Sequence, residues 1–374
     1  MRYDAIVIGL GAMGTAALAH LARRGVRTIG VDRYARGHAL GASAGGTRIV
    51  RKAYFEDPAY VPLLERAYAL WRELEAATDT TLLELTGMLM VGEPDREGIA
   101  GTLRSARKFE LPLDVYDPAD IRRQFPGTQP RSREIGLFER EAGIVFPELA
   151  VAAHLDVATA NGADVRFDAR IASWERREGG YRVKIDDGTA VEASRLVVTA
   201  GMWVSDLLGG LGLPLRVQRN VQIWFSPSTD RFDRGRFPAF FVDRADLPAP
   251  LYGFPSIDGS LKAALHAFGD TADPERLDRA VSDADVAYVR AALESWMPGA
   301  AAAYQRGKVC PYTLTPDGNF IVDRHPDDAG ITLACGFSGH GFKFCPVIGE
   351  IVADLAIDGG TRFDIDFLRA GRFA

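Results

Sequence analysis

The chain has 374 residues, 47% of them hydrophobic and 25% charged, a balance that allows a sizeable core and about two domains without stabilising disulfides or metals. Its net charge of −6 argues against a nucleic-acid-binding protein, which would carry a concentrated basic patch. Three cysteines with no CxxC pair, no apolar run of about 18 residues and no signal peptide favour a cytoplasmic protein with neither a disulfide framework nor a membrane span.

A complete strand–helix–strand unit begins the chain. Gly9, Gly11 and Gly14 stand in the order G-x-G-x-x-G between the first strand and the helix, and Asp32 follows the second strand. Such glycines permit a tight turn, the close approach of a pyrophosphate and the packing of helix on strand, while the acid suits adenosine ribose hydroxyls. The unit therefore predicts a bound dinucleotide, with FAD and NAD both open and NADP disfavoured by the acid. The strand, helix and second strand are expected at residues 3–8, 12–24 and 27–31.

Helical and extended patterns follow one another through the rest of the chain. Helices are expected at residues 59–77, 96–108, 149–160 and 346–357, with a short one that starts at 118. Strands are expected at residues 86–91, 165–167, 181–185, 195–199, 220–225, 237–242 and 331–334. Among these strands, 165–167 and 181–185 are interpreted as one small antiparallel unit around Gly179 and Gly180.

Strands of the buried, parallel type are scattered from one end of the chain to the other. One nucleotide-binding domain must therefore be assembled from distant segments, and the aromatic-rich strands between them suit a second sheet. We expect an α/β fold, in detail a two-domain α+β arrangement. It would consist of a Rossmann-like domain from residues 1–83, 146–216 and 318–374, and a substrate domain with a mixed or antiparallel sheet from residues 84–145 and 217–317.

Several motifs occur along the chain in one order. They are GLGAMG at 9–14, TRIVR at 47–51, YGFPS at 252–256, Lys262 with His266, CPYT at 310–313 and GFSGHGFKF at 336–344. On these motifs the chain resembles the monomeric sarcosine oxidase and N-methyltryptophan oxidase family, within the D-amino-acid-oxidase-like flavoproteins. The resemblance extends over essentially the whole chain, and it implies an FAD-binding domain, a substrate domain and the oxidation of an amine.

The resemblance implies FAD as the cofactor, joined covalently through its 8α-methyl group to Cys310. The Cys310 thiolate would attack the electron-poor flavin, so a neighbouring cation is expected to help by stabilising the thiolate. The alternative is that Cys310 is a buried, inert thiol. Cys335 and Cys345 lie in apolar stretches and are expected in the core. The residues matched to cofactor binding are Gly9, Gly11, Gly14, Asp32, Thr47, Cys310, Gly339, Gly341 and Lys343.

Arg51 and Lys343 match the two cations that hold the substrate carboxylate, a group that needs charge-assisted partners in a dry pocket. The alternative for Arg51 is a surface ion pair with Glu56 or Asp57. Without the resemblance, Lys262 would be an ordinary strand residue. The histidines and tyrosines named next would have structural roles only. Catalytic roles are implied for Lys262, in oxygen activation, and for Arg48, Tyr252, His266, Tyr312 and His340.

Three departures from the family pattern bear on substrate choice. Residues 43–46, Ser-Ala-Gly-Gly, stand where the family often has histidines, Phe241 replaces a smaller or more flexible pocket residue, and the loop at 243–250 is rearranged and proline-rich. The polar lining beside the flavin and the shape of the substrate pocket are therefore expected to differ, which leaves the identity of the amine open.

The predicted function is the oxidation of a secondary amine that bears a carboxylate, sarcosine or another N-methyl amino acid. The imine product would hydrolyse to formaldehyde and the amino acid, while O2 is reduced to H2O2. Three alternatives stay open: an oxidase of cyclic or bulkier donors such as proline, pipecolate or N-methyltryptophan, a flavin dehydrogenase with another electron acceptor, and a non-catalytic flavin subunit. The expected partners are the amine and O2, and the chain is expected to be a monomer without a metal.

Overall fold

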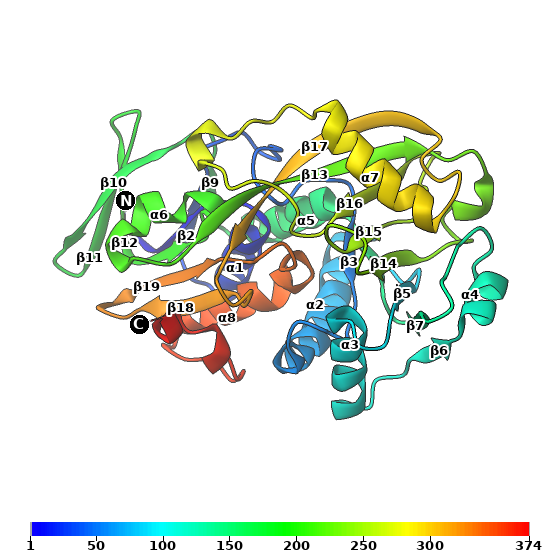
Figure 1. Cartoon of the computed structure of the whole chain (residues 1–374). Coiled ribbons are helices and arrows are strands. Elements are labelled where there is room, and N and C mark those ends of the chain that lie inside the picture. The colour runs from blue at the N-terminus through cyan, green and yellow to red at the C-terminus, as the bar shows by residue number, and fades with distance from the viewer. Residues whose placement is uncertain (1, 374) are drawn as a thin grey trace.

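Two eight-stranded sheets and one three-stranded sheet organise the chain in the computed structural model, which describes residues 2–373. The first large sheet lies on the left of Figure 1 and most strands of the second lie on the right, with several long helices near the centre. Within residues 2–373, no helix is both long enough and apolar enough to cross a membrane.

The first sheet has a parallel core. β1 (Arg2–Ile8) pairs in parallel with β2 (Thr28–Val31) on one side and with β12 (Ala190–Val198) on the other. β19 (Asp328–Cys335) continues this core beside β12, and β9 (Asp164–Arg166) continues it beside β2. Segments far apart in the sequence thus form one sheet, as the predicted fold class requires. The antiparallel strands that complete the sheet are β10 (Ile171–Arg177), β11 (Gly180–Ile185) and β18 (Ile321–His325).

The predicted antiparallel unit of 165–167 with 181–185 is wrong. β9 pairs in parallel with β2 at the edge of the sheet, because it returns to the sheet after a helix, a connection that makes neighbouring strands parallel. The antiparallel partner of β11 is β10, which sequence patterns missed. β10 is largely exposed and rich in charged residues, so it lacks the apolar alternation that marks a strand.

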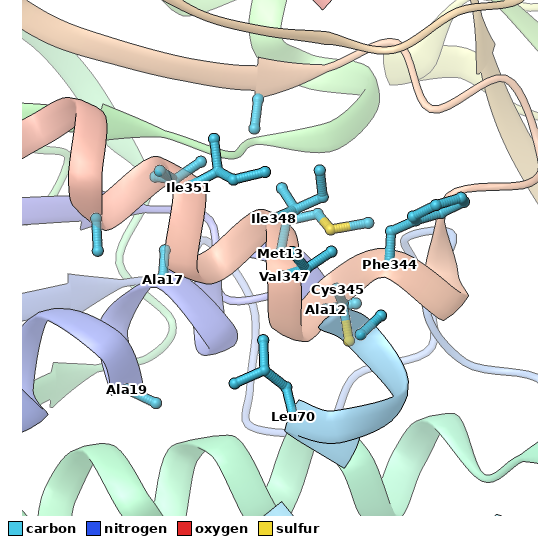
Figure 2. Packing of buried hydrophobic residues seen from close by; sticks show 14 of the residues in the cluster. Ala12, Met13, Ala17, Ala19, Leu70, Phe344, Cys345, Val347, Ile348 and Ile351 are labelled. Atoms are coloured by element: carbon cyan, nitrogen blue, oxygen red, sulfur yellow. The ribbon is translucent and has the colours of Figure 1, made fainter. Parts of the chain in front are cut away.

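Helices cover one face of the first sheet. They are α1 (Ala12–Arg23), α2 (Val61–Thr78), α5 (Pro147–Ala160) and α8 (Cys345–Ile357). Val7 on β1 shares a buried core with all four of them. Figure 2 shows α8 against α1, with Ile348 close to Met13. The two helices approach closely because Gly349 has no side chain: a Cβ there would lie 2.6 Å from Cβ of Ala16.

The second sheet is mostly antiparallel, and only β14 and β5 run parallel to each other. Its outer face packs on α7 (Asp283–Trp296), where Leu293 and Trp296 share a core with Phe225 and Leu265. In order across the sheet, its strands are β17 (Ala303–Leu314), β13 (Arg216–Ser226), β16 (Leu261–Leu265), β15 (Leu251–Gly253), β14 (Ala239–Asp243), β5 (Met88–Gly92), β7 (Ile135–Glu139) and β6 (Asp114–Tyr116).

Shorter elements complete the fold. The small sheet consists of β3 (Arg48–Val50), β8 (Gly143–Val145) and β4 (Leu83–Glu84). The remaining α-helices are α3 (Glu97–Lys108), α4 (Pro118–Gln124) and α6 (Val204–Leu208).

Register places a row of polar residues on the inner face of the second sheet. Asn220 on β13 lies directly opposite Cys310 on β17, and Trp224 lies opposite Lys262 on β16. Directly paired residues of antiparallel strands project from the same face, and alternate residues along a strand share it. Gln222 lies between these two pairs along β13 and therefore projects from the same face.

Candidate active site

A cavity of about 880 Å³ has walls from both large sheets and the small one. Its volume is near the upper end of the range for small-molecule sites, roughly 300–1,000 Å³. Parts of the chain far apart in sequence meet around it. The main lining segments are residues 8–13, 31–33, 41–44, 199–203, 310–313 and 336–343.

The glycine turn between β1 and α1 forms one end of the cavity. Gly9 has φ of +94°, a conformation that favours glycine, and a Cβ there would lie 2.7 Å from the carbonyl oxygen of Thr199. A Cβ on Gly14 would collide with the carbonyl oxygen of Gly9, so this glycine serves the packing of helix on strand and does not line the cavity. Gly11 lines the cavity at the N-terminus of α1 and gives it no side-chain cap.

Asp32 lies at the same end and fixes the turn. Its Oδ2 accepts a hydrogen bond of 2.7 Å from the amide of Leu10, and its Oδ1 accepts one of 2.9 Å from the amide of Tyr34. The carboxylate is 5% exposed and lines the cavity. The N-terminus of α1 lies beside it, and the positive end of the helix dipole suits a phosphate there.

Cys310 lies farther along the cavity, next to a cation. Nη2 of Arg48 is 3.7 Å from Sγ of Cys310, which supplies the neighbouring positive charge that sequence reasoning called for. Arg48 itself is held by the carbonyl oxygens of Ala42, Ala44 and Thr47, at 2.8 to 2.9 Å. Thr47 thus contributes its backbone, and it does not line the cavity.

Lys262 is buried just behind this wall. Its Nζ donates to the carbonyl oxygens of Gly45 and Thr47, at 2.8 and 2.5 Å, and lies 4.0 Å from the ring centroid of Phe254. Burial lowers the pKa of Lys262 well below its ordinary value, and the Arg48 charge lowers it further. Phe254 and Gln222 line the cavity, whereas Lys262 stands one layer away from it.

A cluster of charged groups forms the other end of the cavity. Arg51, 4% exposed, donates from Nη2 to Oε2 of Glu56 at 2.6 Å. Lys343, 5% exposed, donates from Nζ to the carbonyl oxygen of His340 at 2.7 Å. Both cations line the cavity. The expected alternative for Arg51 is half right: the ion pair with Glu56 exists, but it lies in the cavity, with Arg51 buried and Glu56 half-buried.

The protonation of this cluster follows from its environment. Burial, and to a smaller extent the Arg51 charge, lower the pKa of Lys343 to about 7, although Glu56 opposes the shift. Burial by itself would raise the pKa of Glu56, but Arg51, His340 and Lys343 outweigh it and bring the value to about 2. Burial also lowers the pKa of His340 to about 3 and that of His266 to about 4. At pH 7 both histidines are therefore neutral.

Aromatic side chains stand between the charged end and Cys310. The hydroxyl oxygens of Tyr252 and Tyr312 are 3.5 Å apart, and the ring of His266 lies 5.7 Å from that of Tyr312. All three line the cavity. Gly339, with φ of +81°, packs on the Tyr312 ring, and a Cβ there would collide with it.

His340 lines the cavity, but its ring nitrogens bind protein groups. Nδ1 lies 2.6 Å from the hydroxyl of Tyr54, and Nε2 lies 3.0 Å from the carbonyl oxygen of Gly318. A neutral ring satisfies both contacts when Nε2–H donates to Gly318 and Nδ1 accepts from Tyr54. Gly341 lines the cavity one residue later, where a Cβ would lie 2.5 Å from the ring of Phe337.

Sequence reasoning missed many residues of the cavity as site residues, and three of them bear on ligand binding. They are Glu56, Gln222 and Trp203. Oε1 of Gln222 and Nε1 of Trp203 are buried and have no hydrogen-bond partner among the described residues. A signal for Gln222 existed in the recurrence of side-chain amides at every second position of β13, at Gln218, Asn220 and Gln222.

These observations test whether the cavity fits a flavin dinucleotide. Buried polar groups are almost always hydrogen-bonded, so two unpartnered atoms in the wall indicate a polar ligand. The glycine turn suits a pyrophosphate, and the thiol beside a guanidinium suits attachment to an electron-poor ring. No group of three or more metal-ligating side chains was found within residues 2–373. The residues present therefore fit FAD.

The fold and the cavity define a flavin-dependent oxidoreductase, and comparison with known proteins gives the family. Residues 4–355 match the model of the family described as FAD dependent oxidoreductase. The chain belongs to this family, and FAD is its cofactor.

Curated relatives are similar over the whole chain. A monomeric sarcosine oxidase from Streptomyces avermitilis is 43% identical over 378 residues, which cover 100% of this chain and 98% of the relative. An N-methyl-L-tryptophan oxidase from Salmonella dublin is 33% identical over 378 residues and covers 100% of both chains. The resemblance stated from the motifs is confirmed by these matches.

Solved structures support the fold. NikD, an amino acid oxidase essential for nikkomycin biosynthesis, has a TM-score of 0.88 at 24% identity and covers 98% of this chain and 97% of its own. Glycine oxidase from Geobacillus kaustophilus has a TM-score of 0.83 at 20% identity, with 99% and 98% covered. At these identities the likeness concerns the fold, and the predicted fold class is confirmed.

Proposed function

We propose that this FAD-dependent oxidoreductase oxidises a secondary amine bearing a carboxylate, sarcosine or another N-methyl amino acid, with O2 as the electron acceptor. The observation that carries the proposal is the pair of buried cations, Arg51 and Lys343, at one end of a cavity whose other end fits a dinucleotide. The names of two curated relatives, a monomeric sarcosine oxidase and an N-methyl-L-tryptophan oxidase, support the same reaction class.

FAD, when bound, supplies the capacity to take two electrons from the amine and to pass them to O2. We propose that Cys310 holds it covalently, since the Arg48 guanidinium, 3.7 Å from Sγ, would stabilise the attacking thiolate. Gly9, Gly11 and Asp32 would hold the nucleotide end. Gln222 and Trp203 would supply the hydrogen bonds that their unpartnered atoms leave open.

The substrate carboxylate would bind Arg51 and Lys343. Glu56 accepts a hydrogen bond from one guanidinium nitrogen of Arg51, so the substrate carboxylate must share this nitrogen with Glu56 or displace Glu56 from it. His266 and His340 are neutral and add no positive charge. Tyr252 and Tyr312 would line the space for the substrate amine. The positive field of the two cations lowers the pKa of the substrate amine and so favours its neutral, reactive form.

The reaction balances without a further reactant. The amine loses two electrons and two protons, which O2 takes up, and becomes an imine; water then adds to the imine, and formaldehyde leaves the amino acid. One O2 is thereby reduced to one H2O2. Lys262 is buried behind the cavity wall, and its protonated form would favour electron transfer to O2.

We further propose that the chain works as a monomer in the cytoplasm, where cysteines do not form disulfides. All three cysteines are free and buried.

The test is product analysis with purified protein in air. With sarcosine we expect formaldehyde and H2O2 in equal amounts. Peroxide without formaldehyde from proline or pipecolate, together with inactivity on N-methyl amino acids, would instead support a cyclic donor. Reduction of a dye without peroxide would support a dehydrogenase and contradict the role proposed for O2.

A further inference from the structure

A second cavity, of about 400 Å³, lies beside the charged end of the first. Phe55, Phe241 and His266 line both cavities. Their three rings therefore form a shared partition, which we call the aromatic wall. One side of it faces the proposed substrate position, and the other side faces the second cavity.

Phe241 is the central member of the aromatic wall. Its ring centroid lies 5.2 Å from that of Phe55 and 6.5 Å from that of His266. It is 6% exposed and projects from β14 toward the start of α3. A Cβ on Gly98 would lie only 3.2 Å from its Cε1, so α3 packs close against the ring and holds it in place.

The second cavity is polar on its far side and reaches the surface at the start of α3. Asp95 and Glu97, which line it, are exposed. Arg96 donates from Nε and Nη2 to Oδ1 of Asp243 at 2.9 and 2.6 Å, and the amide of Gly98 donates to Oδ2 at 3.1 Å. These bonds fix the far wall, so the cavity is a preformed space and not a gap that side chains would fill.

We propose that Phe241 determines substrate size in this enzyme, and that the second cavity is a side-chain subsite that its ring closes. The inference rests on the proposed function, because it takes the substrate carboxylate to be held by Arg51 and Lys343. With the substrate carboxylate fixed there, a small amine substrate fits in front of the aromatic wall. A substrate with an aromatic side chain would have to place that side chain where the Phe241 ring now lies. The ligand class of the opened subsite is therefore N-methyl amino acids with aromatic side chains.

The experiment compares Phe241→Ala with the matched control Met88→Ala. Met88 lines the first cavity but not the second, so its truncation adds space without opening the aromatic wall. The measured quantity is kcat/KM for N-methyl-L-phenylalanine divided by kcat/KM for sarcosine. We expect this ratio to rise about tenfold or more in Phe241→Ala, the scale on which pocket volume discriminates substrates, and to change less than about threefold in the control.

A binding measurement separates this inference from the proposed function. Phenylacetate and acetate are titrated into each oxidised protein, and the perturbation of flavin absorbance gives both dissociation constants without turnover. Phe241→Ala should gain affinity for phenylacetate relative to acetate, and the control should not. An unchanged preference would overturn the inference, whatever the substrate is. Failure of every N-methyl amino acid to react with the native protein would overturn the proposed function instead. If Phe241→Ala does not fold, Phe241→Leu must shift both ratios in the same direction.

Discussion

Lys343 has its charge set by its surroundings. Burial brings its pKa to about 7, and a carboxylate ligand needs the ammonium form. Binding is therefore strongest below pH 7 and weakens as pH rises, by about tenfold for each unit above the pKa. We expect the dissociation constant of acetate, measured by flavin absorbance, to rise about tenfold between pH 8 and 9. In Lys343→Met this rise should disappear, and an unchanged rise there would assign the titration to another group.

Cys310 carries the proposed covalent link. In Cys310→Ser we expect FAD to separate from the acid-denatured protein, whereas the native chain should retain it and show the added mass. Cys345→Ala is the matched control, because Cys345 is also buried but lies in the core of α8 and not in the cavity. Native protein with no added mass would show that Cys310 is a plain buried thiol.

Glu56 illustrates what sequence reasoning reaches at single residues. The sequence offered Glu56 as a surface partner of Arg51, but it did not indicate that both groups lie inside a cavity beside Lys343. That arrangement depends on the turn at 336–344, which approaches from the far end of the chain. Residue roles that came from the resemblance remain predictions until variants are measured.

At the scale of elements, the packing of α1 on the glycine turn allows the effect of a substitution at Gly14 to be predicted. A methyl group at Gly14 would collide with the carbonyl oxygen of Gly9 and push α1 away from β1. Gly14→Ala should therefore lower the free energy of unfolding by about 1–3 kcal/mol, as overpacking does, and reduce the FAD content. Gly209→Ala is the control, since Gly209 has φ of −56° and a Cβ there meets no atom within 4 Å. Equal melting temperatures and FAD contents for the two variants would contradict this account of the turn.

Some helices and strands could be predicted from local sequence patterns alone, and others could not. β1, α1 and β2 follow from a short run of apolar residues and glycines, and they were predicted within one residue at most ends. β10 was missed because it is exposed, and β9 was given the wrong partner because pairing depends on the path of the chain and not on the strand's own residues. The division of the chain into segments at 83, 145, 216 and 317 stays a prediction.

At the scale of the whole molecule, buried neutral histidine limits stability in acid. His154 on α5 is 3% exposed, and burial lowers its pKa to about 3. In the unfolded chain His154 binds a proton at about pH 6.5, whereas in the folded chain it stays neutral down to about pH 3. The free energy of unfolding is therefore unaffected by His154 above about pH 6.5. As the pH drops from there toward 3, it falls by up to about 1.4 kcal/mol per pH unit. His154→Phe should lose less stability than the native chain between pH 6 and 4.5 in urea denaturation. Identical losses would show that other groups govern the acid response.

The cavity is a property of the whole molecule, and sequence could define its ends better than its shape. The GLGAMG and GFSGHGFKF motifs predicted a dinucleotide and a nearby turn, and both segments line the same cavity. The aromatic wall, the second cavity and the unpartnered atoms of Gln222 and Trp203 arise from contacts between segments that no local pattern reports.

The most direct test of the central claim is anaerobic mixing of the purified yellow protein with sarcosine, followed by flavin absorbance. We expect the native protein to bleach. The Arg51→Met/Lys343→Met variant should still be yellow but bleach at least about a hundredfold more slowly, because the carboxylate has lost both charge-assisted partners. Bleaching of this variant at the native rate would contradict the claim that these two cations hold the substrate.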